Sequence, residues 1–225
     1  MTEQQRNPLP WPARSAQDTV PILLVRHGQT ARNREQRFNG RDDVPLNATG
    51  EAQAKRLADR LHTMPFQQAF SSPLQRAIQT AGPILSGRDL SLQIDERLAE
   101  LDQGALDGLY GPELPRRFPD IFKAWRADPS DVQLPGGETL RQCQARFVEA
   151  LMDIGAGAQP GGPPVLVVAH SMAICTALCA AIDLDLRLFR HVKQRNTAIN
   201  LISYTPGRLQ VRRLNDAAHL EDSPL

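Results

Sequence analysis

The chain has 225 residues with a formal net charge of +1, and 41% of them are hydrophobic. A chain of this length buries roughly 70% of its surface on folding, which is sufficient for one sizeable core without disulfides or metal ions. Its 26 basic residues are balanced by 25 acidic ones. The sequence therefore lacks the basic footprint of a protein that binds nucleic acid or an anionic membrane, and any use of positive charge must be local.

The N-terminal segment and the cysteines predict a cytoplasmic domain. Residues 1–20 contain three prolines and no apolar h-region, which is typical of a flexible leader rather than a secretory signal. The three cysteines form no CxxC pair, and Cys175 and Cys179 lie one helical turn apart, a spacing that favours small buried side chains over a redox or zinc site. We expect the folded domain at 21–215 and a C-terminal tail at 216–225.

The first half of the chain predicts strands that alternate with helices. The apolar run at 22–25 is typical of a strand covered on both faces. A helix should start at Asn47 or Thr49, and a second one at Ser72-Pro73, with Ser72 as its N-cap and an interruption at Gly82-Pro83. The core positions of these helices follow helical spacing and are Ala54, Leu57, Ala58, Leu61, Leu74, Ala77, Ile78 and Ala81. Weaker strands are expected within 64–71 and at 91–94.

The second half begins with an irregular, proline-rich segment at 103–136 that includes a short helix at 121–126. A helix at 140–154, a Gly/Pro linker at 155–164, a strongly apolar strand at 165–169 and a helix capped by Ser171 follow. His170 and Ser171 interrupt the apolar stretch 165–182, which argues against a membrane span. Two closing strands are expected at 198–204 and 209–214. The alternation predicts a parallel or mixed α/β sheet.

Both strongly apolar strands end in histidine. The segment LLVRHG places His27 after the first strand, and LVVAHS places His170 after the other. In an open α/β sheet, ligands bind beyond the carboxyl ends of the strands. A single histidine at such a place is more often structural, but two that follow buried strands in the same way indicate a functional site.

Positive groups near these strand ends indicate an anionic ligand. Arg26 precedes His27, and Arg76 lies in the first turn of a predicted helix. Ser171 opens another helix, whose free N–H groups and dipole favour an anion. Two guanidinium groups, helix-terminal amides and two imidazoles match the oxygens of a phosphate dianion.

Two other kinds of site remain as alternatives. His27, His170 and Glu100 could form a two-His-one-carboxylate metal site, but nearby guanidinium groups would repel a cation and no short ligand spacing supports it. Asp183-Leu184-Asp185 resembles the DxD of magnesium-dependent aspartyl phosphatases, yet it follows a helical run instead of a strand and predicts a loop at a helix end. No GxGxxG, GxxxxGK[ST], HExxH or GxSxG motif occurs.

Four segments resemble motifs of the histidine phosphatase superfamily, also called the phosphoglycerate mutase-like family. They are RHGQTARNREQRFNGRDDVPLNATGEAQA, SSPLQRAIQTA, ERLAELDQGALDG and VVAHSMAI, and together they cover most of residues 21–205. The resemblance implies a three-layer α/β/α fold with a mainly parallel central sheet. It also implies a single domain that uses no metal ion or other cofactor.

The family's residue roles carry over to matching positions. The resemblance makes His27 the nucleophile that becomes phosphohistidine and Glu100 the proton donor, which would have to carry a proton. Arg26, Arg76 and His170 would bind the phosphoryl group, and the matching phosphate-pocket positions are Asn33, Asn39, Gly40 and Ser171. Neighbouring arginines should keep His27 neutral, so that a ring nitrogen can attack phosphorus. The chain departs from the family pattern at Ser171, where many members have glycine, and at Leu106 and Asp107, where they have Trp and Glu.

The acid segment and the following LPGGETL resemble the phosphatase branch of the family. We therefore expect a phosphatase that acts on a small phosphorylated metabolite, with a cofactor-dependent phosphoglycerate mutase or a non-catalytic phospholigand-binding module as alternatives. A homodimer is considered, although no motif specifies one. Residues 103–136 are expected to form a cap that recognises the leaving group. Its aromatic and basic residues are Phe118, Phe122, Trp125, Arg116, Arg117 and Arg126.

Overall fold

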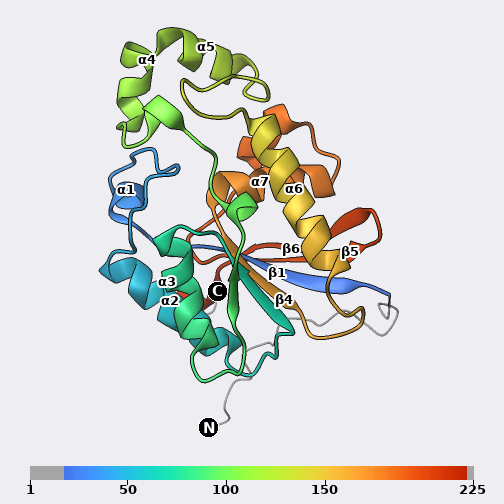
Figure 1. The fold of residues 1–225 in the computed structure, drawn as a ribbon. Helices are drawn as coiled ribbons and strands as arrows, with labels where there is room; N and C mark the ends of the chain where they lie inside the picture. Colours follow the sequence, from blue (N-terminus) through green and yellow to red (C-terminus); the bar gives the residue numbers. More distant parts are fainter. Residues whose placement is uncertain (1–17, 222–225) are drawn as a thin grey trace.

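The computed structural model describes residues 18–221, so most of the expected leader and the last four residues lie outside the described part. A single six-stranded sheet with the order β3-β2-β4-β1-β5-β6 runs through the middle of the chain's fold (Figure 1). Its strands are β1 (Val20–Arg26), β2 (Gln68–Ser71), β3 (Leu92–Ile94), β4 (Val165–Ala169), β5 (Ile199–Thr205) and β6 (Arg208–Asp216). The first four pair in parallel, whereas β5 pairs antiparallel with β1 and with β6. The predicted α/β class with a mainly parallel sheet is confirmed.

Helices cover both faces of this sheet. The helices are α1 (Ala31–Arg34), α2 (Ala48–Leu61), α3 (Gln75–Leu85), α4 (Leu114–Arg117), α5 (Pro119–Ala127), α6 (Leu140–Ala156) and α7 (Ser171–Ala181). Short 3₁₀ turns lie at Glu96–Leu98, Gly104–Leu106, Gly111–Glu113, Leu186–His191 and Ala218–Leu220. Helices α2 and α3 lie on one side of the sheet and α6 and α7 on the other, as Figure 1 shows.

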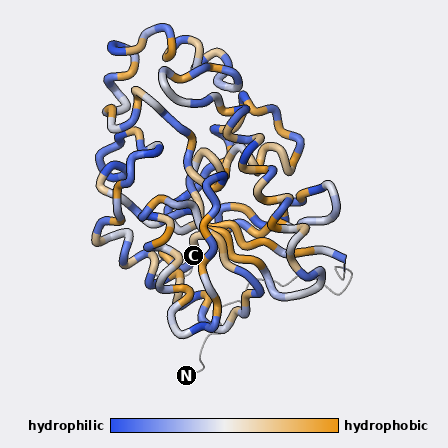
Figure 2. Tube along the Cα trace, in the orientation of Figure 1, coloured by the Kyte–Doolittle hydropathy of each residue, from blue (hydrophilic) through white to orange (hydrophobic). Residues whose placement is uncertain are grey.

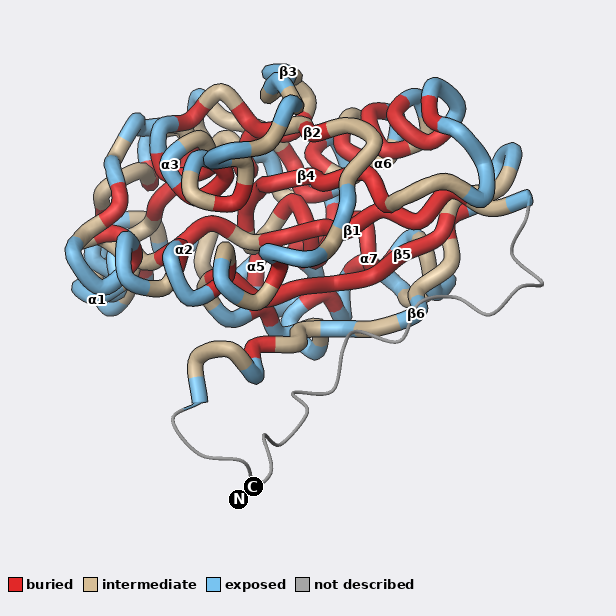
Figure 3. The backbone as a smooth tube through the Cα atoms, turned by 90° about the horizontal axis from the view of Figure 1, so that it is seen from below, coloured by how far each residue is buried: buried red, intermediate tan, exposed pale blue. Residues whose placement is uncertain are grey.

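Side chains of the central strands alternate between two cores. Ile22 and Leu24 of β1 pack into the core that includes α6 and α7, whereas Leu23 and Val25 pack toward α2 and α3. Adjacent residues of a strand point to opposite faces, so a strand covered on both sides must be apolar at every position. This explains why the buried strands are the hydrophobic centre of Figure 2 and the buried centre of Figure 3.

Three details of the predicted helices are wrong. Helix α3 begins at Gln75 after an uncapped Leu74, because the Ser72 hydroxyl accepts the Leu74 N–H and contacts His170 instead of capping the helix. Pro83 lies inside α3, where burial of the helix's apolar stripe compensates for one lost backbone hydrogen bond. Ser171 is the first residue of α7 rather than its cap.

Parts of the expected linker 155–164 and of the expected tail 216–225 form regular structure. Helix α6 continues to Ala156, two residues into the expected linker 155–164. A β-carbon at Gly155 would lie 2.3 Å from the Tyr204 ring, so the close approach of helix and strand requires glycine there. After residue 215, β6 extends to Asp216 and the turn Ala218–Leu220 contacts α2. Within the described residues, no helix is long and apolar enough to cross a membrane; the apolar stretch 165–182 is β4 followed by α7.

Candidate active site

Strands β1 and β4 are neighbours in the sheet and end together. Arg26 pairs with Ala169 in their parallel register, so His27 and His170 follow at the same edge. The His27 N–H donates to the Ala169 carbonyl at 2.9 Å, and the two imidazole centroids lie 5.1 Å apart. The structure thus brings together the two histidines that the strand pattern singled out, beyond the carboxyl ends of two central strands.

The hydrogen bonds of His27 define which ring nitrogen is free. Its Nδ1 lies 2.6 Å from the Gly28 carbonyl oxygen, which can only accept, so Nδ1 carries the proton and Nε2 keeps a lone pair. Burial lowers the pKa of His27 well below its usual value, and the charges of Arg26 and Arg76 lower it further. A buried neutral imidazole with an available Nε2 lone pair is the form that can act as a nucleophile.

His170 has the opposite proton arrangement. Its Nδ1 accepts a hydrogen bond from Arg76 Nε at 3.2 Å, so the proton of the neutral ring lies on Nε2, which donates to Ser72 Oγ at 2.7 Å. Burial is the main cause that lowers the pKa of His170, followed by the charge of Arg76. The site therefore pairs an imidazole that accepts at Nε2 with one that donates there.

Two arginines supply the positive charge. Arg76 is fully buried at the start of α3 and donates to the carbonyl oxygens of Gly40 at 2.6 Å and Asp42 at 2.9 Å. Burial lowers its pKa to about 10, so it stays cationic at neutral pH. Arg26 donates to the Gln194 carbonyl at 2.6 Å, while its buried Nε has no partner among the described protein groups. This donor remains available for an anion.

The loop after His27 contains three of the predicted phosphate-pocket residues. Asn33 accepts from Thr30 N and donates its own N–H to Thr30 Oγ1, closing a capping box around α1. Asn39 is buried and also donates to Thr30 Oγ1, at 3.1 Å. Gly40 presents its carbonyl oxygen to Arg76. Asn33 and Asn39 thus shape this loop, and Gly40 anchors Arg76 to it.

Asp107 secures the same loop, a role that sequence analysis missed. Its carboxylate accepts the N–H groups of Gly40 and Asp42, both at 2.9 Å, and pairs with Arg32 at 2.7 Å. It therefore fixes the two residues whose carbonyl oxygens hold Arg76. The only signal in the sequence was the departure from the family pattern at position 107, because 67 residues separate Asp107 from Gly40 in the chain.

Glu100 lies at the N-terminus of α7, the helix end at which the sequence analysis expects a bound phosphate. Its Oε1 accepts the N–H groups of Leu101 at 2.8 Å and Ala173 at 3.0 Å, and its Oε2 accepts only that of Met172, at 3.1 Å. The free amides of this helix therefore bind the protein's own carboxylate, which the helix dipole favours. Oε2 retains a site at which a proton can be bound.

Arg146 and Glu138 hold the chain around Glu100 and were also missed. Arg146 donates to the carbonyl oxygens of Arg97, Ala99 and Glu100 at 2.7–2.9 Å. It also forms a two-nitrogen ion pair with Glu138, which accepts the Asp102 N–H at 2.8 Å. One planar guanidinium thus sets the backbone on both sides of the acid.

The arginines of the predicted cap turn away from the site's polar groups. Arg116 is 81% exposed and pairs with Glu113, while Arg117 and Arg126 lie over Phe118 and Phe122.

Asp183 and Asp185 lie in the turn after α7, as expected for a helix end. The cysteines are free and buried, and within residues 18–221 no group of three His, Cys, Asp or Glu side chains is arranged to hold a metal ion.

The chain is similar to known proteins in sequence and in fold. The chain is 29% identical to phosphoserine phosphatase 1 of Hydrogenobacter thermophilus, covering 89% of this chain and 94% of that one. It is 33% identical to a probable phosphoglycerate mutase of Enterobacter sp., covering 82% of this chain and 85% of the relative. The solved structure of Bacillus stearothermophilus YhfR matches with a TM-score of 0.84 and 29% identity, covering 90% of this chain and all of that one.

A mycobacterial glucosyl-3-phosphoglycerate phosphatase has the same fold, with a TM-score of 0.77 and 26% identity over 88% of this chain and 99% of its own. The sequence profile of the histidine phosphatase superfamily (branch 1) matches residues 22–217, which include both histidines and every described strand from β2 to β6. This chain belongs to the histidine phosphatase superfamily.

Proposed function

We propose that this chain is a phosphatase that hydrolyses small phosphate monoesters through a phosphohistidine on His27. The observation that carries the proposal is the hydrogen bond from His27 Nδ1 to its neighbour Gly28, which leaves the Nε2 lone pair free beside the charges of buried Arg76 and half-buried Arg26. The phosphatase names of relatives and of structural neighbours support the same reaction class.

In the first step, Nε2 of His27 forms a bond to phosphorus while the bond from phosphorus to the ester oxygen breaks. The electron pair of that bond stays on the leaving oxygen, which takes a proton from Glu100 and departs as an alcohol. In the second step, water attacks phosphorus, its proton passes to Glu100, and the N–P bond breaks. Orthophosphate leaves, and both His27 and Glu100 return to their starting states.

The remaining site residues neutralise and orient the phosphoryl group. Phosphoryl transfer depends mainly on in-line positioning and on compensating negative charge on the equatorial oxygens. Arg26 and Arg76 supply donors for those oxygens in this proposal. The Nε2–H of His170 joins them by exchanging its hydrogen bond to Ser72 Oγ for one to the phosphoryl group. The wall of the phosphate site is completed by four further residues, Asn33, Asn39, Gly40 and Ser171. No step requires a metal ion.

A phosphoglycerate mutase is the second candidate, favoured by the relative of 33% identity that carries this name. A mutase must protect its phosphoenzyme from water, whereas a phosphatase must admit water to it. The two functions therefore differ in the fate of one intermediate, and both need the same nucleophile.

The test is phosphate release from a panel of phosphate esters in EDTA, comparing wild type with His27→Ala, with conversion of 3-phosphoglycerate to 2-phosphoglycerate followed in parallel. We expect release that is independent of metal and lost in His27→Ala. Isomerisation without release would indicate the mutase. Activity that requires added magnesium, or release that survives His27→Ala, would overturn the proposed site, and binding without turnover would indicate a phospholigand-binding module.

The substrate, the cellular compartment and the oligomeric state are further predictions. A small phosphorylated metabolite is the expected substrate, and the three free, buried cysteines are compatible with a reducing cytoplasm. A homodimer is testable by light scattering of the purified chain.

A further inference from the structure

Asn200 is a polar residue in the interior of the sheet. It lies on strand β5, which pairs with β1, and its side chain is fully buried. A buried amide lowers stability unless hydrogen bonds replace those that it made with water. What this amide contributes to the molecule therefore depends on its hydrogen-bond partners.

Asn200, Gln194 and Asn215 form an amide network. The Nδ2 of Asn200 donates to the Leu24 carbonyl oxygen at 3.2 Å and to Gln194 Oε1 at 2.8 Å. Its Oδ1 accepts Gln194 Nε2 at 3.0 Å and the Asn215 N–H at 2.9 Å. An amide side chain offers two donor and two acceptor positions, so all four of Asn200 are used. The network thus joins strand β1, strand β6 and the loop that precedes β5.

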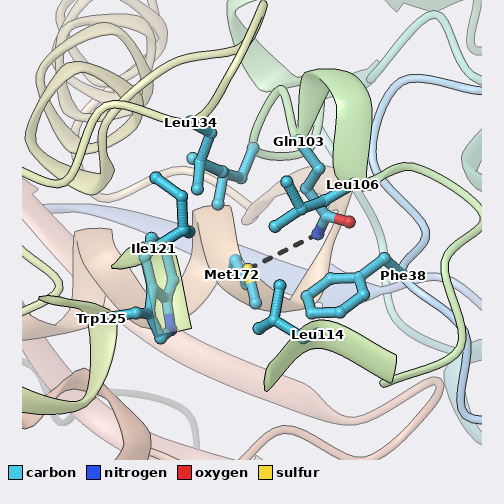
Figure 4. A pocket seen from close by; sticks show the side chains of 9 residues that line it. Phe38, Gln103, Leu106, Leu114, Ile121, Trp125, Leu134 and Met172 are labelled. Carbon is cyan, nitrogen blue, oxygen red and sulfur yellow. Dashed lines mark hydrogen bonds between the residues drawn. The ribbon is translucent and has the colours of Figure 1, made fainter. Parts of the chain in front are cut away.

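The other buried glutamine among the described residues, Gln103, is bonded very differently. In Figure 4 it lies among apolar side chains, where its Nε2 donates to Met172 Sδ at 3.7 Å. Its Oε1 has no hydrogen-bond partner among the described protein groups. Gln194 instead has both polar atoms of its side chain paired with Asn200. The paired amides define where the Gln194 side chain lies as well as burying it.

The amide network fixes the direction of one peptide group. The Gln194 carbonyl oxygen accepts Arg26 Nη1 at 2.6 Å. The N–H of the same peptide group, on Arg195, donates to Asn215 Oδ1 at 2.7 Å. In a planar trans peptide the C=O and N–H point in opposite directions. With its N–H bonded to Asn215 and the Gln194 side chain held by Asn200, this peptide group directs its carbonyl at Arg26.

The sheet is irregular where the amide network forms. One residue of β5, Asn200, lies opposite two residues of β6, Leu214 and Asn215, which is the arrangement of a β-bulge. Asn215 has a φ of 51°, a left-handed conformation that asparagine adopts more readily than most residues. Bulges frequently lie next to active sites, where they redirect a side chain. Here the bulge turns the Asn215 N–H toward the side chain of Asn200.

Arg26 is anchored at one end of its guanidinium group. Its Nη1 donates to the Gln194 carbonyl oxygen, whereas its buried Nε has no partner among the described protein groups. The guanidinium group is planar, so the anchor at Nη1 restricts the direction of the Nε–H. A shift of the Gln194 carbonyl would therefore turn this donor relative to His27, the next residue in the chain.

We propose that the amide network positions Arg26 for catalysis. By orienting the Gln194 carbonyl, it keeps the Nε–H of Arg26 directed at the phosphoryl group in the strand-end site around His27 and His170. Its three members are positioning residues that do not touch the substrate. This inference rests on the proposed phosphatase function and adds a layer of residues behind the phosphate site that sequence analysis did not single out.

Gln194→Met tests the proposal with a side chain of similar size that cannot form the amide pair. A slightly misplaced group costs up to about 10²-fold, so we expect kcat/KM for nitrophenyl phosphate to fall by about 10–10²-fold. The inhibition constant of orthophosphate should rise in parallel. In an Arg26→Ala background the same substitution should change neither value by more than about twofold, because no guanidinium group remains to be positioned.

The double-mutant comparison separates positioning from a general structural role. Equal losses in both backgrounds would overturn the inference and place the effect at His27, whose carbonyl oxygen accepts Asn196 Nδ2 from the same loop. Wild-type kcat/KM in folded Gln194→Met, or in Arg26→Ala, would also overturn it while leaving the phosphatase function intact. Absence of any phosphate release that depends on His27 would instead overturn the phosphatase function.

Gln67→Met is the matched control. Gln67 also uses both atoms of its amide, with the Pro163 carbonyl oxygen at 2.6 Å and the Gln159 N–H at 2.7 Å, but it precedes β2 at the end of the sheet opposite the histidines. It should keep wild-type kcat/KM and phosphate inhibition. A loss like that of Gln194→Met would count against the inference.

A second variant covers the case in which Gln194→Met does not fold, which thermal unfolding shows. Asn200→Ser acts from the other side of the pair, because a serine hydroxyl is too short to hold both atoms of the Gln194 amide. We expect it to lower kcat/KM in the wild-type background and to have no further effect in Arg26→Ala. Any other pattern in the folded protein would overturn the inference.

Discussion

The strand-end site and helices α4 and α5 are held in place by different forces. Arg76 and Glu100 each make three hydrogen bonds, to carbonyl oxygens, an imidazole or backbone amides. Helices α4 and α5, of four and nine residues, instead place their charged residues outward and pack through apolar side chains. Hydrogen bonds between buried groups fix direction as well as distance, whereas apolar contacts tolerate repacking. Fixed geometry suits phosphoryl transfer, which depends on in-line positioning.

Among the variants that test this comparison, Glu100→Gln should have the largest effect on turnover. General acid catalysis contributes about 10²–10⁴-fold, so turnover of alkyl phosphates should fall by that range. Nitrophenyl phosphate, whose leaving group needs no proton, should show a far smaller loss in its first step. Burst kinetics on the two substrates measure the difference. Equal losses in that step would remove the proton-donor role from Glu100.

Arg76→Lys should have the next largest effect. Lysine retains the charge but cannot reach two carbonyl oxygens and an imidazole at once, so we expect kcat/KM to fall by about 10²–10³-fold. Arg88→Lys is a matched control, because Arg88 also donates to several carbonyl oxygens, but between α2 and α3, away from the histidines. It should reduce stability and spare kcat/KM. Similar activity losses in the two variants would show that Arg76 acts only on folding.

Arg146→Lys tests whether precise support of Glu100 matters. Loss of the bonds to the carbonyl oxygens at 97, 99 and 100 should shift the acid and lower kcat by up to about 10²-fold, with a smaller change in KM. The loss should be greater for alkyl phosphates than for nitrophenyl phosphate. Arg141→Lys, which changes an exposed ion pair on the same helix, should be neutral. A loss of equal size on both substrates would argue against support of the acid.

The strand-end residues were predictable because their signal is local. An apolar run followed by histidine places the side chain at a strand terminus whatever surrounds it, and both His27 and His170 lie there. Asn47 caps α2 as predicted, but the caps predicted at Ser72 and Ser171 failed for the opposite reason. Ser72 and Ser171 have the right residue type, but Ser72 is engaged by His170, and the amides after Ser171 are bonded to Glu100. Partners distant in the chain override a local preference.

The supporting residues could not be predicted from spacing at all. Asp107 meets Gly40, and Arg146 meets Ala99, only because strands and loops far apart in sequence converge at one edge of the sheet. The orientation of the cap arginines could not be predicted for a related reason. Their helices are short and begin at Leu114 and Pro119, so the pattern of polar residues does not define which face meets the site.

The smallest expected effect is a pH dependence of stability that arises from histidines outside segment 104–134. Burial is the main cause that lowers the pKa values of His27, His170 and His219, the last to about 4. Between each lowered pKa and the unfolded value near 6.5, the unfolded chain binds more protons, so the free energy of unfolding decreases as pH falls. Segment 104–134 contains no histidine.

Urea unfolding between pH 7.5 and 4.5 measures this dependence. Wild type should lose stability progressively below pH 6.5, and His219→Gln should show a shallower slope down to about pH 4. An identical slope in the variant would show that His219 is not protonated on unfolding in this range.

The most direct test of the account is to identify the phosphorylated residue during turnover. Glu100→Gln should still be phosphorylated by nitrophenyl phosphate, because this leaving group needs no proton, but should lose the phosphoryl group slowly for want of a base. Quenching in alkali and mass spectrometry of the peptides should then locate an acid-labile phosphoryl group on His27, and none in His27→Ala/Glu100→Gln. A phosphoryl group on any other residue, or burst kinetics without a covalent intermediate, would contradict the central claim.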